Sequence, residues 1–268
     1  MTGENNGYYA DYGSLAAFAK SLRNAFVYDG NYSKHRKRKH GAITKDLGGQ
    51  RFIGYLQNHD QVGNRAQGER SSRLMSRGKL KIGAALVLTS PFIPMLFQGE
   101  EWGATTPFLF FTDHRDPEMA AAVGEGRCKE FAEFGWKPEE MPQPQARETF
   151  ERSELNWSEL PEPAHTEMLD WHKRLIQLRR AEKDLNDGQM KRVLVEFDEN
   201  KNWLVVQRGA ISVACNFNGH SQQIPLRHGK CRGLLASQPE VNAVNRSVML
   251  PAESVAICGR ETLSRKPF

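Results

Sequence analysis

The chain contains 268 residues, of which 39% are hydrophobic, and it carries a formal net charge of +5. A chain of this length and composition can bury a core and ordinarily forms one or two soluble globular domains. Its most apolar stretch, residues 82–97, is interrupted by Pro91 and Pro94 and falls short of the roughly 20 residues of a membrane span, so no membrane partner is predicted.

The first predicted element is a helix over Ser14–Phe26. Apolar residues at 15, 18, 22, 25 and 26 form a stripe with helical spacing, and Ser14 is a suitable N-cap. The basic run Ser33–His40 (SKHRKRKH) follows, and such a run on an accessible surface can contact nucleic acid or serve as an import signal. Because no aromatic residues interleave with its charges as stacking platforms, the run is interpreted as a solvated loop and no nucleic-acid partner is predicted.

Strands and helices alternate over the middle of the chain. Phe52–Gln57 is a predicted strand, Leu74–Leu88 a helix and Pro94–Gln98 a second strand. A loop-rich excursion then runs from 99 to about 163, and another helix covers about 166–181. The order strand, helix, strand, helix is the βα repeat of a parallel barrel.

From about Lys191 the pattern changes to short β-rich runs that turn-forming segments separate. This arrangement is typical of a small antiparallel sandwich. The predicted strands are Val193–Phe197, Trp203–Gln207, Ile211–Phe217, Gln222–Leu226 and Ser254–Cys258.

The four cysteines, at positions 128, 215, 231 and 258, form no CxxC pair. Isolated thiols persist as small hydrophobes in a reducing compartment. The residues after Met1 (TGENNGYY) show neither the charged leader nor the apolar core of a signal peptide. A cytoplasmic location is therefore predicted.

Residues 52–70 read FIGYLQNHDQVGNRAQGER, an apolar run that ends on Gln57-Asn58-His59-Asp60. A strand that stops on an imidazole beside a carboxylate is typical of a barrel strand that delivers polar groups to a ligand. The segment resembles the α-amylase superfamily (glycoside hydrolase family 13) motif that carries the transition-state-stabilising aspartate. Its extended form QNHDQVGNR is similar to the malto-oligosyltrehalose trehalohydrolase family. Further blocks resembling that family are MLFQGEEWG (95–103), PFLFFTDHRDPE (107–118), EFAEFGW (130–136) and TFERSELNW (149–157).

The resemblance also implies which part of such an enzyme this chain represents. Family members carry a nucleophilic aspartate and a general-acid glutamate on earlier barrel strands, whereas the HD motif here lies 58 residues from Met1. A complete barrel alone needs about 250 residues. The expected fold is the C-terminal part of a (β/α)8 TIM barrel at 1–187, followed by a β-sandwich domain at 188–268, with the N-terminal half of the barrel missing.

Asp60 is the predicted catalytic residue. In a retaining glycosidase a fixed negative charge near the sugar ring stabilises the oxocarbenium-like transition state when water is excluded. A carboxylate can also accept two hydrogen bonds from adjacent sugar hydroxyls. The alternative is that Asp60 caps a following turn or helix, and the flanking resemblance favours the catalytic role.

The resemblance extends the predicted substrate site around Asp60. Successive strand side chains point to opposite faces, so His59 and Asp60 can converge only if the strand has already turned into a loop, which Gln61–Asn64 would form. His59 has the alternative of a hydrogen-bonded strand-end histidine, and Gly63 that of a plain turn glycine. The predicted substrate-binding residues are His59, Asp60, Gln61, Val62, Gly63 and Asn64.

The neighbouring carboxylates Glu100 and Glu101 are not expected to form a catalytic pair. Retaining chemistry requires carboxyl groups about 5 to 5.5 Å apart, whereas adjacent residues of an extended strand point in opposite directions. Glu100 is interpreted as a hydrogen-bonded structural acid, and no nucleophile, general acid, metal site or cofactor is predicted in this chain. Six residues of the excursion could either contact the faces of a sugar ring or pack the excursion onto the barrel. They are Trp102, Phe110, Phe111, Asp113, His114 and Trp136.

Two hypotheses for function remain open. The first is the C-terminal portion of a retaining glycoside hydrolase that cleaves the α-1,4-glucosidic bond next to the terminal trehalose unit, with malto-oligosyl trehalose or a related α-glucan as its partner. On this hypothesis the chain alone is inactive. The second is a non-catalytic carbohydrate-binding remnant, and a sister activity such as a glucan branching enzyme also fits the sequence.

Overall fold

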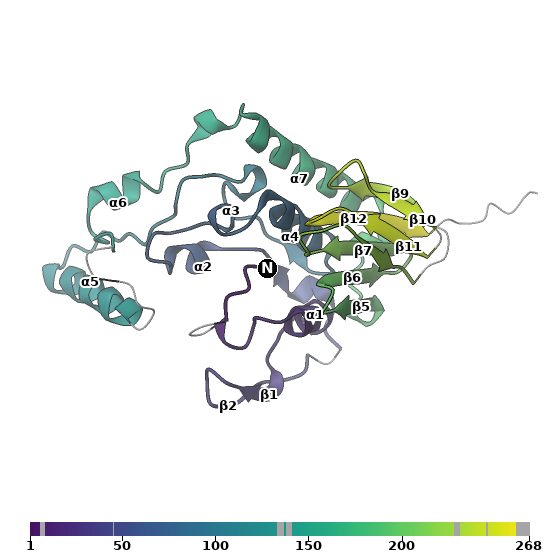
Figure 1. The fold of residues 1–268 in the computed structure, drawn as a ribbon. Helices are drawn as coiled ribbons and strands as arrows, with labels where there is room; N and C mark the ends of the chain where they lie inside the picture. Colours follow the sequence, from purple (N-terminus) through teal and green to yellow (C-terminus); the bar gives the residue numbers. More distant parts are fainter. Residues whose placement is uncertain are drawn as a thin grey trace, which may run out of the picture.

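A mixed α/β region is followed along the chain by an antiparallel β region (Figure 1). The structure is a computed structural model that describes residues 1–5, 9–44, 46–132, 137, 141–227, 231–244 and 246–260. The mixed region contains α1 (Leu15–Asn24), β1 (Asp29–Ser33), β2 (Arg38–Gly41), β3 (Ile53–Gly54), α2 (His59–Gly63), α3 (Ser71–Leu74), α4 (Arg77–Thr89), β4 (Ile93–Pro94), α5 (Pro117–Ala132), α6 (Arg147–Glu151), α7 (Pro163–Ala181) and α8 (Lys183–Asn186).

The antiparallel region consists of β5 (Val193–Asp198), β6 (Trp203–Arg208), β7 (Ile211–Asn216), β8 (Gln222–Pro225), β9 (Cys231–Ala236), β10 (Asn242–Val244), β11 (Ser247–Leu250) and β12 (Ser254–Arg260). In the described residues these strands form two sheets, with the orders β5-β6-β7-β12-β9 and β10-β11-β8. One apolar cluster contains side chains of both sheets, including Trp203 and Val205 from the first and Val248 and Leu250 from the second. The predicted antiparallel region is confirmed, and β9, β10 and β11 were not predicted.

The three long predicted helices are present, and their ends follow local sequence signals. Ser14 accepts a hydrogen bond from the Ala17 backbone N–H and starts α1 as predicted. Ser76 caps α4 in the same way through Lys79 N–H, and Pro163 opens α7 at a position where a missing N–H costs nothing. These caps explain why α4 begins three residues after the predicted Leu74.

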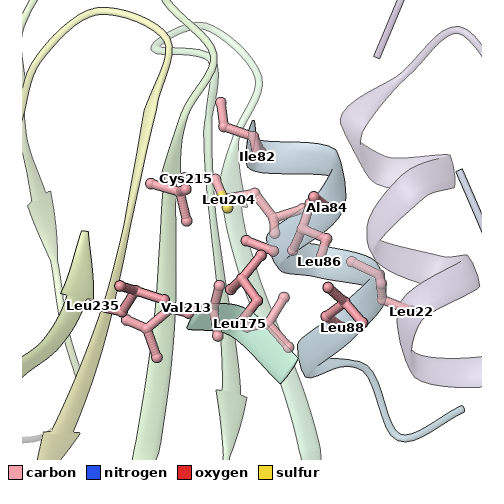
Figure 2. Packing of buried hydrophobic residues seen from close by; sticks show 14 of the residues in the cluster. Leu22, Ile82, Ala84, Leu86, Leu88, Leu175, Leu204, Val213, Cys215 and Leu235 are labelled. Atoms are coloured by element: carbon pink, nitrogen blue, oxygen red, sulfur yellow. The ribbon is translucent and has the colours of Figure 1, made fainter. Parts of the chain in front are cut away.

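The main core lies where the mixed region meets the five-stranded sheet. Helix α4 is buried on nearly all sides between α1 and the sheet, and Figure 2 shows its Ile82, Ala84, Leu86 and Leu88 among side chains from the strands, α1 and α7. Residues 81–89 of α4 are all buried. Among the described residues, no helix combines the length and the apolar character that crossing a membrane would require.

The two strands of the mixed region pair in parallel over a shorter distance than the sequence predicts. Ile93 N–H donates to the Phe52 carbonyl and Met95 N–H to the Gly54 carbonyl, both at 2.9 Å. In the described residues this sheet contains β3 and β4 alone. The ladder has only two residue pairs, so β3 is shorter than the predicted 52–57, and β4 shares only Pro94 with the predicted 94–98.

Arg179 of α7 fixes the turn that leads from α4 into β4. Its Nη1 donates to the carbonyls of Leu88 and Ser90 at 2.8 Å each, and its Nη2 donates to the Phe92 carbonyl at 2.9 Å. A planar guanidinium can satisfy several carbonyls at once, which a lysine cannot. Helix α7 therefore holds β4 in place beside β3.

Arg208 of β6 joins the antiparallel sheet to the mixed region. Its side chain is fully buried, and its guanidinium donates to the Thr89 carbonyl at 2.6 Å and to the Asp187 carbonyl at 2.7 Å. It also forms an ion pair with the Asp187 carboxylate at 3.1 Å. The predicted domain boundary at 187/188 thus falls beside a polar contact that links the two parts, and the boundary itself stays a prediction.

The basic run Ser33–His40 is exposed from Lys34 to Lys39, as a solvated segment should be, but it forms the turn and second strand of the β1–β2 hairpin and not a loop. Asp11 explains the difference by accepting hydrogen bonds from Ser33 Oγ at 2.6 Å, Tyr28 Oη at 3.0 Å and Lys34 N–H at 2.9 Å. These bonds, chiefly the one from Ser33, lower the pKa of Asp11 to about 2. A remote carboxylate thus orders a segment whose own sequence is polar.

The excursion at 99–163 is more helical than predicted, since it contains α5 and α6. Figure 1 shows both helices at the end of the molecule that is remote from the antiparallel sheets. The α5 sequence PEMAAAVGEGRCKEFA mixes small and charged residues without an apolar stripe, so its spacing does not indicate a helix.

Candidate functional site

The predicted site lies on α2, a short helix that follows β3. The Asn58 side chain accepts hydrogen bonds from Asp60 N–H at 2.9 Å and Gln61 N–H at 3.1 Å. Gln61 Oε1 accepts one in return from Asn58 N–H at 3.0 Å, which completes a capping box. The expected loop at 61–64 is therefore a helical turn, and its cap is Asn58 and not Asp60.

His59 and Asp60 converge at the start of α2. His59 Nε2 lies 3.4 Å from Asp60 Oδ1, and the two side chains are 70% and 68% exposed. Their backbone has left the strand by this point, as convergence requires. Both groups are available to a ligand, while the structure leaves the Asp60 carboxylate open to water.

The other four predicted substrate-binding residues have different surroundings. The Gln61 side chain belongs to the capping box, and Val62 is buried with 1% of its surface exposed. The Gly63 carbonyl and the Asn64 amide oxygen accept hydrogen bonds from Arg127 of α5, at 2.7 and 3.1 Å. The structure thus brings all six residues together on one turn, and it directs the side chains of His59 and Asp60 outward.

Near α2, buried polar side chains connect the segments that follow β3 and β4. Gln57 Oε1 accepts a hydrogen bond from Ser71 N–H at 2.9 Å, and the Gln57 side chain also hydrogen-bonds to Glu100. Arg70, which is 1% exposed, donates to the Gln98 and Thr106 carbonyls at 2.6 Å each. The chain segments that follow the two strands are therefore held in a fixed relation.

Glu100 is the buried acid of this cluster, with 6% of its surface exposed. It accepts a hydrogen bond from Phe97 N–H at 3.4 Å, which agrees with its interpretation as a hydrogen-bonded structural acid. Burial raises the pKa of the Glu100 carboxyl to about 7. Its neighbour Glu101 follows it in a 3₁₀ turn, so the two residues do not continue the strand.

The raised pKa of Glu100 predicts a pH-dependent stability. A carboxyl whose pKa rises on folding binds its proton more tightly in the folded state, so its stabilising effect is present at low pH and is lost as pH rises toward 7. Between pH 5 and 7.5 we expect Glu100 to lower the free energy of unfolding by about 2 kcal/mol. Urea titrations across this range should show a weaker pH dependence for Glu100→Gln, and an unchanged one for the exposed Glu154→Gln. Identical slopes for Glu100→Gln and the unsubstituted chain would contradict the assignment.

Arg127 is the site residue that the sequence interpretation missed. Its guanidinium contacts Gly63 and Asn64 and lies 4.0 Å from the centroid of the Phe110 ring. An arginine in an excursion helix, 63 positions from its partner, gives no local signal of this contact.

Several aromatic residues of the excursion pack against one another. Phe97, Phe108, Phe111 and Phe150 form a chain of edge-on contacts with ring centroids 5.2 to 5.7 Å apart. The buried Trp102 donates its indole N–H to Glu159 at 2.9 Å. These contacts favour the packing role for Phe111 and Trp102. Asp113 and His114 are exposed, and Trp136 lies outside the described residues.

A cavity of about 970 Å³ lies beside the site. Its lining includes Phe18 of α1, Phe52 and Tyr55 around β3, and Gln61 and Arg65 at α2. Of the predicted substrate-binding residues, Gln61 and Val62 line the cavity, whereas His59 and Asp60 do not, so these two outward-pointing side chains lie outside it. Within the part of the chain that the structure describes, no group of three or more His, Cys, Asp or Glu side chains could hold a metal ion.

The sequence is similar to curated malto-oligosyltrehalose trehalohydrolases, although no protein-family model matches it. The protein of Mycobacterium tuberculosis is 44% identical over 228 residues, which is 84% of this chain and 39% of the relative. That of Rhizobium sp. (strain M-11) is 42% identical over 259 residues, covering 96% of this chain and 43% of the relative. The chain therefore spans about two fifths of the length of these relatives.

Solved structures of the α-amylase family resemble the fold. A Salmonella typhimurium protein assigned as an alpha amylase superposes with a TM-score of 0.83 at 34% identity, over 97% of this chain and 44% of its own. An isomaltulose synthase from Klebsiella sp. LX3 superposes with a TM-score of 0.51 at 17% identity, over 77% of this chain and 42% of its own. At that identity the second match shows a similar fold alone.

Proposed function

Since the chain is a partial-length homologue of malto-oligosyltrehalose trehalohydrolase with an α-amylase-family structure, we propose that it supplies part of the sugar site of such a hydrolase. The observation that carries the proposal is the position of His59 and Asp60. They stand side by side, exposed, on a capped turn that follows β3. The reaction is the hydrolysis of the α-1,4-glucosidic bond next to the terminal trehalose unit of malto-oligosyl trehalose.

Asp60 acts in this proposal as the transition-state stabiliser. The sugar at the cleaved bond develops positive charge, and a fixed carboxylate beside the ring stabilises that charge once water is excluded. His59 donates a hydrogen bond to the same sugar. We assign the nucleophile and the general acid to the part of the relatives that this chain does not match, because two-step retaining hydrolysis needs both groups.

We further propose that β3 and β4 are adjacent strands of a (β/α)8 barrel, with α4 as the helix that connects them. Their parallel pairing and the burial of α4 support this arrangement. Ile53 and Ile93 are opposite each other in the register, yet they are 60% and 52% exposed. In a closed barrel such inward-facing side chains fill the interior, so the remaining strands would cover them.

The test compares the chain with a chimera in which it replaces the matching segment of the Mycobacterium tuberculosis relative. We expect the purified 268-residue chain to release no trehalose from malto-oligosyl trehalose above a buffer blank, because one stabilising carboxylate cannot carry out the reaction. The chimera is expected to release trehalose, with the intact relative as the positive control.

Two outcomes would contradict this proposal. Trehalose release by the chain alone, abolished by Asp60→Asn, would show that the chain needs no further catalytic groups. A folded chimera that forms new branches in an α-glucan and releases no trehalose would favour a branching activity instead.

A further inference from the structure

Helix α2 has too few residues to hold its own conformation in water. It contains five residues, His59–Gly63, whereas isolated helices shorter than about 12 residues are marginal even with favourable sequences. The direction in which His59 and Asp60 point therefore depends on contacts at the two ends of α2. The capping box of Asn58 and Gln61 fixes its first turn.

Arg127 of α5 fixes the other end. Its Nη2 donates to the Gly63 carbonyl at 2.7 Å and its Nη1 to Asn64 Oδ1 at 3.1 Å. Asn64 N–H in turn donates to the Asp60 carbonyl at 3.0 Å. A cation beside carbonyls at a helix C-terminus is electrostatically favourable, and the arginine fork can hold two acceptors at once. Two hydrogen bonds, through Asn64, thus connect Arg127 to the backbone of Asp60, and a third holds the Gly63 carbonyl.

The guanidinium is itself held in place from its other side. It lies over the Phe110 ring, 4.0 Å from the centroid, in a cation–π contact. The residues before Phe110 are anchored, because Phe108 N–H donates to the Gly68 carbonyl at 2.9 Å and Leu109 N–H donates to Ser153 Oγ at 3.0 Å. Gly68 has a positive φ of 56°, and a Cβ there would clash with Phe108. Arg127 is therefore clamped between a rigid segment and α2.

From this geometry we propose that Arg127 is a positioning residue, which holds the His59–Asp60 turn in the orientation that the sugar site uses. The inference rests on the proposed function for the identity of the site, and on the contacts above for the role of Arg127. It makes α5 a part of the site, although Figure 1 shows this helix at the end of the molecule that is remote from the antiparallel sheets. Docking of α5 against α2 is then a condition for Asp60 to act.

The first test uses the 268-residue chain itself. We expect Arg127→Ala to raise the hydrogen-exchange rates of the Val62 and Asn64 amides by at least about tenfold, because the end of α2 loses two charge-assisted hydrogen bonds. Arg127→Lys should restore part of the protection. The matched control is Lys129→Ala, which removes an exposed cation from the same helix and should leave α2 unchanged. Amides of β7 and β12 report whether each variant remains folded.

A purely structural role predicts another pattern. If Arg127 only anchors α5, its removal would speed exchange in α5 and leave the α2 amides protected, which would overturn the inference. This result does not depend on catalysis, so it stands even if the chimera proves inactive and the proposed function fails.

The second test is a double-mutant cycle in the chimera. Arg127→Ala should lower kcat by roughly tenfold with a smaller change in KM, since it weakens the interaction of Asp60 with the transition state. If Arg127 acts through Asp60, this loss should largely disappear when Asp60 is already Asn. Equal losses in both backgrounds would show that Arg127 acts independently of Asp60, against the proposal.

Discussion

Asp60→Asn is expected to lower the turnover of the chimera by at least about 100-fold while KM changes little. The substitution keeps the size of the side chain and removes its charge. That charge matters most when the sugar ring becomes positive. Its loss therefore reduces the stabilisation of the transition state more than that of the bound substrate. Loss of one such electrostatic group is on the order of 3 kcal/mol. Steady-state kinetics of trehalose release measure both constants.

The structure supplies the controls for this experiment. The Asp60 side chain is 68% exposed, so its replacement should change the free energy of unfolding by less than about 0.5 kcal/mol, and lost activity cannot be ascribed to misfolding. Glu154→Gln removes another exposed carboxylate, in the excursion, and should leave turnover unchanged. An unchanged turnover in Asp60→Asn, with a raised KM alone, would show that Asp60 binds substrate without stabilising the transition state.

Arg208→Met is expected to destabilise the protein by about 4 kcal/mol. The side chain is fully buried, and its removal leaves the Thr89 and Asp187 carbonyls and the Asp187 carboxylate without this donor. Removing one partner of a buried ion pair typically costs about 3 to 5 kcal/mol. Because Arg192 still pairs with the Asp187 carboxylate, most of this loss comes from the Thr89 and Asp187 carbonyls that lose their donor. Guanidinium-induced unfolding of the chain measures the loss.

Arg192 provides a matched control, since it pairs with the same Asp187 carboxylate at 2.7 Å. Its side chain is 44% exposed, and exposed ion pairs contribute less than about 1 kcal/mol. Arg192→Met should therefore have a small effect. Similar losses for both variants would show that burial of Arg208 does not set its contribution.

Local sequence signals were sufficient for the elements whose apolar residues follow a clear spacing. The predicted ends of six elements lie within two residues of the observed ends. These elements are α1, with its Ser14 cap, and the strands β5, β6, β7, β8 and β12. The β1–β2 hairpin and α5 were not predicted, because a remote carboxylate holds one and the other has no apolar stripe. Such elements depend on contacts that local spacing does not contain.

The candidate site likewise contains features that follow from local sequence and features that do not. The Asn58-x-x-Gln61 capping box is a local pattern, and the position of His59 and Asp60 follows from the motif around them. Arg127, Phe110 and the buried Glu100 cluster come from segments that only the folded chain brings next to α2. Sequence analysis could therefore identify the groups proposed to contact a sugar, whereas it could not identify the contact of Arg127 with the turn that carries them.

The arrangement of the main core has a consequence for the order of folding during synthesis. Ala19 and Leu22 of α1 share this core with Val255 and Ile257 of β12, at opposite ends of the described chain. In the sheet β12 lies between β7 and β9, so neither the sheet nor the core is complete before β12 has left the ribosome. Contacts of such long sequence separation slow folding. The apolar faces of α1 and α4 thus stay partly uncovered until β12 joins the sheet, and such exposed apolar surface makes a partly folded chain prone to aggregation.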